Sequence, residues 1–303
     1  AGTNFVTDGY ISVTSDKSGY DYMVVEKTNT GDVEVKPAVA APEVKVDKIP
    51  QEDQETVKAA AKSVSAPTLG AAAADEAQKI DKTKADELVA KANKVTGNAK
   101  DKKLYVQSAL KVEPTAYDKE SKTLTLEITP QYRVVASTAT KADEIKLDGN
   151  SKNAQVVQDY QTMNITKETV VTMELPTGFV ADGVNELSVK HIKHDGTVEY
   201  YTGKVVGGTN GTKAITFTTN GFSPFTIYAN VAAYIGETAY PTLQAAVENV
   251  KNNETIKLAK NVDEATIVTV AKSINFKIDT DGKTFDVAKN IVAGSNTTVK
   301  VTG

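Results

Sequence analysis

Hydrophobic and polar residues alternate along much of the chain between residues 101 and 230. In the clearest run, Ile215, Phe217 and Thr219 alternate with a more polar set, which is the period of a strand with one buried face. Turns rich in glycine and asparagine separate such runs at intervals of about 8–12 residues, a spacing typical of β-sandwiches. The pattern predicts a mainly β protein with an Ig-like β-sandwich over 101–230. Its expected strands are 104–112, 122–129, 132–138, 144–147, 154–159, 168–175, 186–192, 197–206, 213–219 and 224–228.

The first fifty residues also carry strand-like patterns. Alternation within residues 3–27, interrupted by a turn at 15–19, predicts two strands joined as a hairpin. Residues 28–50 combine spaced prolines with alternating valines and charges, which predicts an extended linker with one edge strand near 33–37. We therefore expect residues 1–50 to form an N-terminal β hairpin followed by an extended linker.

The period changes between residues 51 and 100, where we expect a short helical segment before the sandwich. Residues 51–64 are rich in Ala, Lys and Glu and lack Gly and Pro, which predicts a helix. A second helix is expected within 71–96, with apolar residues on one face. Thr83 and Asp86 have the spacing of a capping box, so we expect Thr83 to cap this helix.

The last segment, 231–303, has a third pattern. Residues 234–240 read as a small hairpin, and Thr242 is placed to cap a helix over 243–250. A helical cap followed by short strands with Asn, Asp and Gly turns is how a parallel β-helix begins, so we expect the start of a parallel β-helix-like domain. Its expected strands are 255–258, 267–270, 274–278, 284–287 and 298–301.

Composition and charge narrow the classes of function. The net charge is −4, and charges of both signs are interspersed, which argues against nucleic-acid binding and against binding to a membrane surface. No apolar run approaches the roughly 20 residues of a membrane helix, so no membrane insertion is expected. The absence of cysteine excludes disulfides, thiolate metal sites and a cysteine nucleophile.

Two motifs have the composition of metal sites. His191 and His194 form an H-x-x-H pair beside Asp195, but residues three apart on a strand point to opposite faces, so we expect exposed hairpin residues. The Asp195-Gly196 pair predicts the tip of that hairpin. Asp279–Gly282 resembles the start of a calcium loop but lacks the distal Glu, so we expect a turn, no metal site and no cofactor.

Other polar groups are candidates for catalysis by residue type. The pairs Asp263/Glu264 and Glu52/Asp53 could serve a glycosidase, but no aromatic platform for a sugar flanks them, so we expect solvated charges. The run Gly207–Gly211 lacks the Lys of a phosphate-binding loop, which favours a hairpin loop. These patterns predict no catalytic residues.

Tyrosines are the remaining candidates for contact with a partner. Tyr200, Tyr201, Tyr234 and Tyr240 are amphipathic and could anchor a protein or a glycan. The alternative is that they pack within strands or at module junctions, because aromatic residues suit strands.

A Lys–Asn isopeptide crosslink was also weighed, because such bonds occur in some sandwich domains of Gram-positive bacteria. The candidates are Lys190 or Lys204 opposite Asn185 or Asn220, with Glu174 as the nearby carboxylate. The sequence does not fix which strands face each other, so this stays an open alternative.

Several stretches resemble modules of repetitive, adhesin-like cell-surface proteins of gut Firmicutes. The β-sandwich resemblance rests on Leu124–Thr138, Val170–Phe179, Val189–His191 and Gly221–Phe225. Tyr234–Val247 (YIGETAYPTLQAAV) is similar to the opening of their β-helix modules, and Phe5–Tyr10 looks like the closing coil of another. The resemblance implies a chain cut from a longer repetitive protein and implies no catalytic residues.

Taken together, these patterns predict a non-catalytic extracellular module of a bacterial surface protein, either attached to the cell or secreted. It would act as a stalk or adhesin, and its partner could be a host protein or a glycan. Two other classes stay open: a fragment of a carbohydrate-active β-helix enzyme, and a self-assembling filament or surface-layer subunit joined through its terminal strands.

Overall fold

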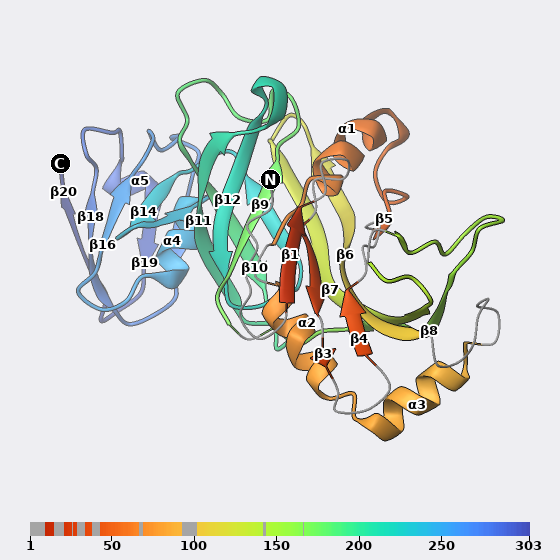
Figure 1. Ribbon diagram of the computed structural model, residues 1–303. Coiled ribbons are helices and arrows are strands. Elements are labelled where there is room, and N and C mark those ends of the chain that lie inside the picture. The colour runs from red at the N-terminus through yellow and green to blue at the C-terminus, as the bar shows by residue number, and fades with distance from the viewer. Residues whose placement is uncertain are drawn as a thin grey trace. The chain divides into compact units, whose positions relative to one another are not determined.

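The structure, a computed structural model, is mainly β, with 42% strand against 18% helix, which confirms the expected class (Figure 1). It describes residues 43–66, 69–92, 102–141, 144–165 and 167–303. Of residues 1–42 it describes only the strands β1 (Tyr10–Thr14), β2 (Asp21–Val25), β3 (Lys27–Thr28) and β4 (Glu34–Pro37). Strands β1 and β2 pair antiparallel, as the hairpin prediction requires, whereas the expected turn at 15–19 and the stretch Phe5–Gly9 lie outside the described residues.

The chain forms two compact units built from interleaved segments. Unit 1 comprises Ala1–Thr115, Leu126–Glu174 and Thr218–Ser223, and unit 2 comprises Ala116–Thr125, Leu175–Phe217 and Pro224–Gly303. Strands β6 (Lys103–Asp118) and β7 (Thr123–Ser137) each contribute residues to both units. The four-segment division expected from the sequence stays a prediction.

The main strands of unit 1 are longer than the sequence pattern suggested. The two strands expected at 122–129 and 132–138 are one strand, β7, because Pro130 does not end it. Proline cannot donate a hydrogen bond, but the Pro130 carbonyl still accepts one from the Met163 amide at 2.8 Å. Strand β8 (Ala154–Thr162) pairs antiparallel with β7, and β5 (Glu43–Val44) pairs parallel with β6.

One expected strand of unit 1, at 144–147, is absent from the structure. The side chain of Asn153 bonds this backbone instead: its oxygen accepts from the Lys146 amide at 2.7 Å, and its nitrogen donates to the Glu144 carbonyl at 2.8 Å. A side chain that satisfies backbone groups competes with a strand ladder.

Within its described residues, unit 1 contains three α-helices. Helix α1 (Gln51–Lys62) matches the predicted first helix, and the single helix expected within 71–96 is in fact two, α2 (Leu69–Gln78) and α3 (Lys82–Ala90). The described core beside α2 and α3 consists of small and branched apolar side chains: Ala73, Ala77, Ile80, Ala85, Leu88, Ala92, Leu104, Val106, Val134, Ala136, Val157 and Met163. The helices therefore bury alanine-rich faces against strands rather than forming a core of their own.

The predicted N-cap residue of α3 was wrong. Asp81, not Thr83, is the N-cap residue of α3, and its carboxylate accepts from the Lys84 amide at 2.8 Å. Both residue types can cap, but the cap must sit where the backbone is still extended, and that residue is Asp81.

Unit 2 contains an antiparallel set of strands close to the predicted positions. It consists of β10 (Glu186–Ile192), β11 (Val198–Gly207), the unit 2 part of β12 (Lys213–Thr219) and β13 (Phe225–Tyr228). The Asp195-Gly196 hairpin is confirmed: the Lys193 amide donates to the Thr197 carbonyl, and Gly196 adopts a φ of 83°. That left-handed conformation is the reason for a glycine at this turn.

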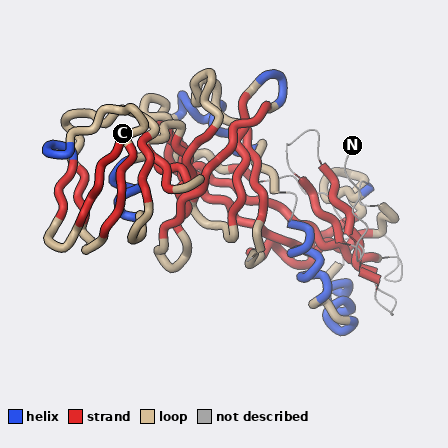
Figure 2. The backbone as a smooth tube through the Cα atoms, turned by 90° about the vertical axis from the view of Figure 1, so that its left-hand side faces the viewer, coloured by secondary structure: helices blue, strands red, loops and turns tan. Residues whose placement is uncertain are grey.

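The C-terminal part of unit 2 mixes one hairpin with parallel strands (Figure 2). Strands β14 (Ala233–Ile235) and β15 (Thr238–Tyr240) form the expected hairpin, and Thr242 caps helix α4 (Leu243–Asn249) as expected. Beyond them, β16 pairs parallel with β18, β18 with β20, and β17 with β19. These strands are β16 (Thr255–Leu258), β17 (Val268–Val270), β18 (Asn275–Asp279), β19 (Ile291–Ala293) and β20 (Thr298–Thr302).

The strand expected at 284–287 is absent and is replaced by a short helix, α5 (Val287–Asn290), followed by the unpredicted strand β19. Asp286 starts α5, because its carboxylate accepts from the amides of Ala288 and Lys289. The interior of this region is apolar, with Val247, Ile256, Phe276 and Ile278 almost fully buried. One face of each short strand thus supports a common core.

Candidate functional site

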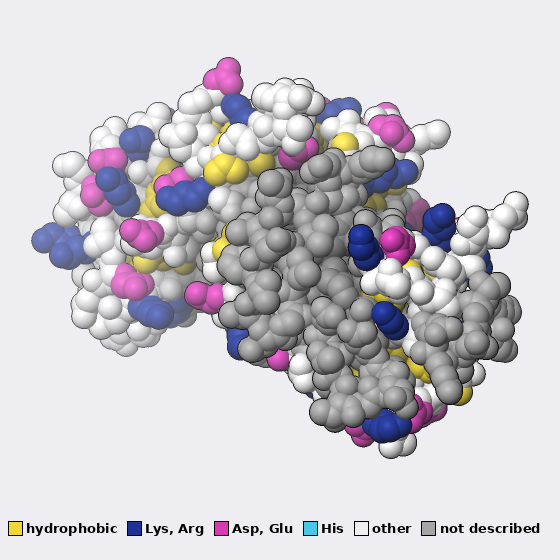
Figure 3. Space-filling view, viewed as in Figure 1, with side chains coloured by type: hydrophobic (Ala, Val, Ile, Leu, Met, Phe, Trp, Pro, Cys, Tyr) yellow, Lys and Arg dark blue, Asp and Glu magenta, His cyan; other side chains and the backbone are white. Residues whose placement is uncertain are grey.

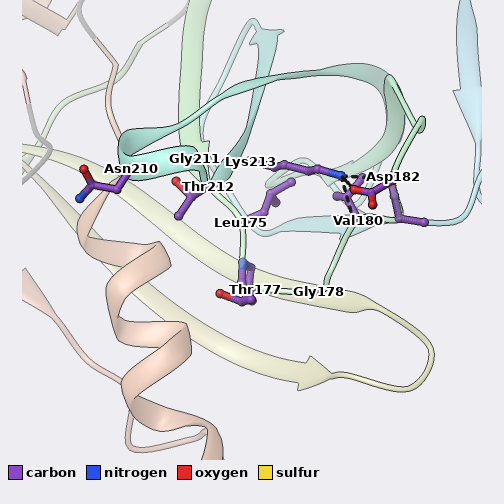
Figure 4. Close-up of a pocket in the computed structure, with 11 residues that line it drawn as sticks. Leu175, Thr177, Gly178, Val180, Asp182, Asn210, Gly211, Thr212 and Lys213 are labelled. Atoms are coloured by element: carbon purple, nitrogen blue, oxygen red, sulfur yellow. Dashed lines mark hydrogen bonds and ion pairs between the residues drawn. The ribbon is translucent and has the colours of Figure 1, made fainter.

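One hollow of unit 2 has a volume of about 570 Å³ (Figure 4). Its walls are residues 175–178 and 180–182, which follow β9 (Thr169–Glu174), and residues 210–213, which join β11 to β12. Sequence analysis identified neither wall as a binding site, and it identified 207–211 only as a hairpin loop. The hairpin-loop interpretation is confirmed by the antiparallel pairing of β11 with β12.

Lys213 links the two walls of the hollow. Its ammonium group lies 2.9 Å from a carboxylate oxygen of Asp182 and also donates to the carbonyl oxygens of Val180, at 3.5 Å, and Ala181, at 3.3 Å (Figure 4). An ammonium has three protons to donate. The ammonium group of Lys213, on one wall, therefore donates hydrogen bonds to three acceptors on the other wall.

This pairing decides the electrostatic character of the hollow. The hydrogen bond and charge of Lys213 lower the pKa of Asp182, so its carboxyl stays ionised and is a poor general acid. Because the two charges offset each other, the remaining polar surface consists of Thr177, Asn210, Thr212 and backbone amides. Neutral hydroxyl and amide groups suit an uncharged, hydroxyl-rich ligand better than an ion.

A second set of polar residues surrounds His191 on the β10–β11 hairpin. The expectation that His191 is exposed was wrong: only 1% of it is accessible, whereas His194 is exposed. His191 lies on β10, whereas His194 lies in the turn that follows, so the two histidines differ in burial. His191 stacks on Phe225 with ring centroids 4.6 Å apart, and its Nδ1 lies 3.0 Å from the Tyr201 hydroxyl.

The His191 network continues to two charged groups. The Tyr201 hydroxyl donates to Glu199 at 2.7 Å, and Lys193 lies 2.5 Å from the other oxygen of that carboxylate. Burial lowers the pKa of His191 and outweighs the opposing charge of Glu199. Burial acts to raise the pKa of Glu199, but hydrogen bonds from Lys193 and Tyr201 outweigh it and the pKa is lowered. A neutral imidazole beside a paired carboxylate stabilises the hairpin.

The four tyrosines proposed as partner contacts have different surroundings. Tyr200 and Tyr240 pack on each other with ring centroids 5.0 Å apart, and burial raises the pKa of Tyr200 to about 12. Tyr201 is half-buried and bonded to Glu199. Tyr234 lines a second hollow of about 470 Å³ together with Glu186, and burial, followed by the charge of Glu186, raises its pKa to about 12. A role for these tyrosines in partner contact stays a prediction.

The remaining acidic candidates of the C-terminal region lie at turns and on the surface. Asp279 accepts from the Asp281 amide at 2.9 Å, Asp281 adopts a φ of 47°, and Gly282 one of 75°, which confirms the turn. Asp263 and Glu264 are exposed. No group of three or more His, Cys, Asp or Glu side chains suited to a metal ion occurs in the part of the chain that the structure describes.

The acidic pair of unit 1 lies in the first turn of α1, where Glu52 is exposed and Asp53 is half-buried. Acidic side chains are favourable at this end of a helix because of its partial positive charge. The helix terminus therefore accounts for the pair.

The strand register does not place either candidate crosslinking lysine opposite Asn185 or Asn220. Lys190 lies opposite Tyr200 and Thr226 in the neighbouring strands. Lys204 lies opposite Glu186, with its side chain 66% exposed and its ammonium 3.2 Å from that carboxylate.

Charges on the described face are of both signs and interspersed (Figure 3). Among the described residues, no helix has the length and apolar character needed to cross a membrane. Comparisons of the chain with protein-family models, with curated proteins and with solved structures gave no match.

Sequence reasoning missed the residues that define the Figure 4 hollow. Lys213 and Asp182 are 31 positions apart, and neither lies in a recognisable motif. The available signal was the cluster of turn residues at 207–211. This cluster predicts a loop, but it does not predict that residues 175–182 form the opposite wall of the hollow. Only the pairing of strands brings the two walls together.

Proposed function

We propose that the chain is a non-catalytic extracellular module of a bacterial surface protein, serving as a stalk that presents a binding site. In this proposal residues 101–230 form an Ig-like β-sandwich, and residues 231–303 form the start of a parallel β-helix. The observation that carries the proposal is the regular stacking of the C-terminal strands.

Side chains reinforce this stacking at a constant spacing. The Asn252 side-chain oxygen accepts from the Asn275 amide, and the Asn275 oxygen accepts from the Thr298 amide, each across 23 residues. Asn261 accepts from the Thr284 amide across the same 23 residues. Repeated coils that bury apolar strand faces and bond their turns to one another form a stiff rod. Stiffness of this kind suits a stalk.

The hollow in Figure 4 supports a binding role. Its walls are loops tied to strands and to each other by Lys213, so the site is preformed, which reduces the entropic cost of binding. Its neutral hydroxyl and amide lining favours a glycan over a charged ligand.

A glycan-binding screen with matched variants tests this proposal. Wild-type protein is expected to bind neutral glycans, and Thr177→Val is expected to weaken binding at least about tenfold by removing a hydroxyl from the wall. Thr255→Val, an exposed strand position outside the hollow, is the control and should bind like the wild type. Equal binding by both variants would contradict the assignment of the site.

The glycans used in the binding screen also test the alternative that the chain is part of a carbohydrate-active enzyme. Release of new reducing ends or of unsaturated products by the wild-type protein would show a hydrolase or lyase and would reject the non-catalytic proposal. We expect no such products.

Self-assembly is a second candidate, favoured by apolar side chains exposed near the last coils. Ile267, Val287 and Val292 are 64%, 50% and 56% exposed, and within the described strands β20 pairs with β18 alone. An open strand edge beside apolar side chains is a template for another strand. In this proposal, copies of the chain join through these terminal strands.

Light scattering over a range of protein concentrations tests self-assembly. If the terminal strands join copies, the mass rises with concentration, and Val292→Lys abolishes the rise. Val170→Lys, at another exposed strand valine, is the control and should leave it unchanged. A monomer mass at every concentration contradicts this candidate.

A further inference from the structure

Arg133 has an unusual position in unit 1. It is the single arginine of the sequence and lies on β7, where the pairing with β8 is irregular between Tyr132 and Val135. Bulged pairing of this kind redirects a side chain and is frequent near functional sites. Arg133 is half-buried, and its guanidinium carbon lies 4.7 Å from the centre of the Tyr160 ring.

A hydrogen bond fixes the inner side of this guanidinium. Its Nε donates to the side-chain oxygen of Gln107 on β6. This bond also fixes the orientation of the Gln107 amide, because the reversed amide would set two donors against each other. Stacking on Tyr160 and bonding to Gln107 therefore hold the plane of the guanidinium in place.

The donors of this cluster exceed its acceptors. Gln107 is fully buried, and its side-chain nitrogen has no hydrogen-bond partner. Among the residues that the structure describes, none accepts a hydrogen bond from the two terminal nitrogens of Arg133 or forms an ion pair with it. The terminal nitrogens of Arg133 are not among the buried unpaired atoms of the described residues, so an acceptor from outside the chain can reach them.

We propose that Arg133, supported by Tyr160 and Gln107, binds an oxyanion group: the carboxylate or sulfate of an acidic ligand. The two terminal nitrogens of a guanidinium match two oxygens of such a group in a bidentate pair. A neutral hydroxyl can accept from the guanidinium, but it carries no negative charge and is a weaker partner than an oxyanion. This site is separate from the Figure 4 hollow and stands whether or not the stalk proposal holds.

The single arginine makes a direct test possible by NMR. The protein gives one arginine Nε–H signal, which can be followed while glucuronate or sodium sulfate is added, with sodium chloride at matched ionic strength as the reference. The expected result is a saturable shift with glucuronate, with sulfate or with both, and little shift with chloride. The two titrations distinguish a carboxylate ligand from a sulfate ligand. Equal, non-saturating shifts with all three salts would mean screening alone and would overturn the proposal.

Variants separate a binding role from a structural role. Arg133→Lys keeps the positive charge but loses the bidentate geometry. Its affinity for glucuronate or sulfate, measured by calorimetry, is expected to be at least tenfold lower than that of the wild type. Lys167→Met, at an exposed lysine of the same unit, should leave binding unchanged. Backbone amide spectra show whether each variant keeps its fold. A folded Arg133→Lys variant with wild-type affinity would also overturn the proposal.

Discussion

At the scale of single residues, His191 shows how burial changes the role of a side chain. The sequence places it beside an Asp-Gly turn, which is typical of exposed residues, but the aromatic rings of Phe225 and Tyr201 cover it. Burial lowers the pKa of His191 below its ordinary 6.5, so the folded protein holds the neutral form. Folding is therefore linked to pH through this residue.

Because of His191, the stability of the protein should fall as the pH drops from 6.5 toward the lower pKa of this residue in the folded protein. With the folded pKa below 6.5, the unfolded chain binds the proton first. Stability contributed by the neutral imidazole is therefore complete above pH 6.5 and is lost as the pH falls toward the folded pKa. A tenfold difference in proton affinity corresponds to about 1.4 kcal/mol. Urea unfolding of the wild type between pH 7.5 and 5.5 measures this decline.

The decline should be smaller in His191→Gln, which carries no titrating imidazole. At pH 7.5 this variant should already be about 1–3 kcal/mol less stable, because it leaves the Tyr201 hydroxyl with a poorer partner. His194→Gln, which changes the exposed histidine, is the matched control and should retain the wild-type pH dependence. If His191→Gln and the wild type declined in parallel, another group would be responsible.

The α3 cap shows where local sequence patterns are insufficient at this scale. Thr83 and Asp86 have the correct spacing for a capping box, and Asp81 is an equally good capping residue two positions earlier. The choice depends on which residue before the helix is the last to keep an extended backbone, and Asp81, with a ψ of 176°, is that residue. Local spacing predicted a cap in this stretch but not which residue provides it.

At the scale of elements, Asn290 explains why a helix replaces the strand expected at 284–287. Its side-chain nitrogen donates to the carbonyls of Asp263 and Thr266, at 3.0 and 2.8 Å, and its oxygen accepts from the Asp286 amide at 2.8 Å. Asn290 is 1% exposed, so these bonds have no competition from water. They hold the start of α5 against the loop that contains Asp263 and Thr266.

Replacing Asn290 should therefore strongly destabilise the region around α5. Asn290→Ala removes three part-buried hydrogen bonds: the Thr266 carbonyl and the Asp286 amide lose this partner, whereas the Asp263 carbonyl keeps the Thr266 amide. An unmade buried hydrogen bond costs about 1–3 kcal/mol. Partial solvation on relaxation makes about 2–4 kcal/mol a reasonable expectation for the total loss. Chemical unfolding measures the loss, and hydrogen exchange should show faster exchange at Asp286.

Lys289→Ala provides the control, because this neighbouring side chain of α5 is 60% exposed and its ion pair with Asp286 is long at 3.9 Å. It should change stability by less than about 0.5 kcal/mol. Similar losses in both variants would indicate that α5 as a whole, rather than the Asn290 bonds, determines the effect.

The accuracy of the sequence predictions differed between strands. Alternation located β10, β11, β12 and β13 well, because an antiparallel strand with one buried face has a period of two. It divided β7 in two at Pro130, and it missed β19 altogether. A proline carbonyl can still pair, and a three-residue strand is too short to show a period. The two candidate sites were not predicted from the sequence, because the Arg133 cluster and the Lys213 hollow each combine residues from separate strands.

At the scale of the whole molecule, the interleaving of the two units has a consequence for folding. Unit 2 includes Ala116–Thr125, which is separated along the chain from the rest of that unit. Within unit 2, the Lys122 carbonyl accepts from the Ala229 amide at 3.0 Å, and the hydroxyls of Thr125 and Thr226 lie 2.9 Å apart. A cut by sequence position alone therefore removes part of the unit.

A fragment of residues 175–303 should accordingly fold poorly. It lacks 116–125, so β13 loses its partners at Lys122 and Thr125 and leaves an unpaired strand edge. Circular dichroism is expected to show a broad, weakly cooperative melt. Joining 116–125 to the start of the fragment through a flexible linker should sharpen and raise the transition. A fragment that melts as sharply without the added residues would show that unit 2 does not need them.

The sequence by itself determined the mainly β class, the position of most strands, the Asp195-Gly196 turn and the Thr242 cap. These features depend on side-chain period and on backbone preferences, which act over a few neighbouring residues. Only the tertiary structure decided that His191 is buried, that Lys213 bridges two loops and that Arg133 stacks on Tyr160. Each of these depends on which strands lie side by side, and pairing between distant segments leaves no local trace in the chain.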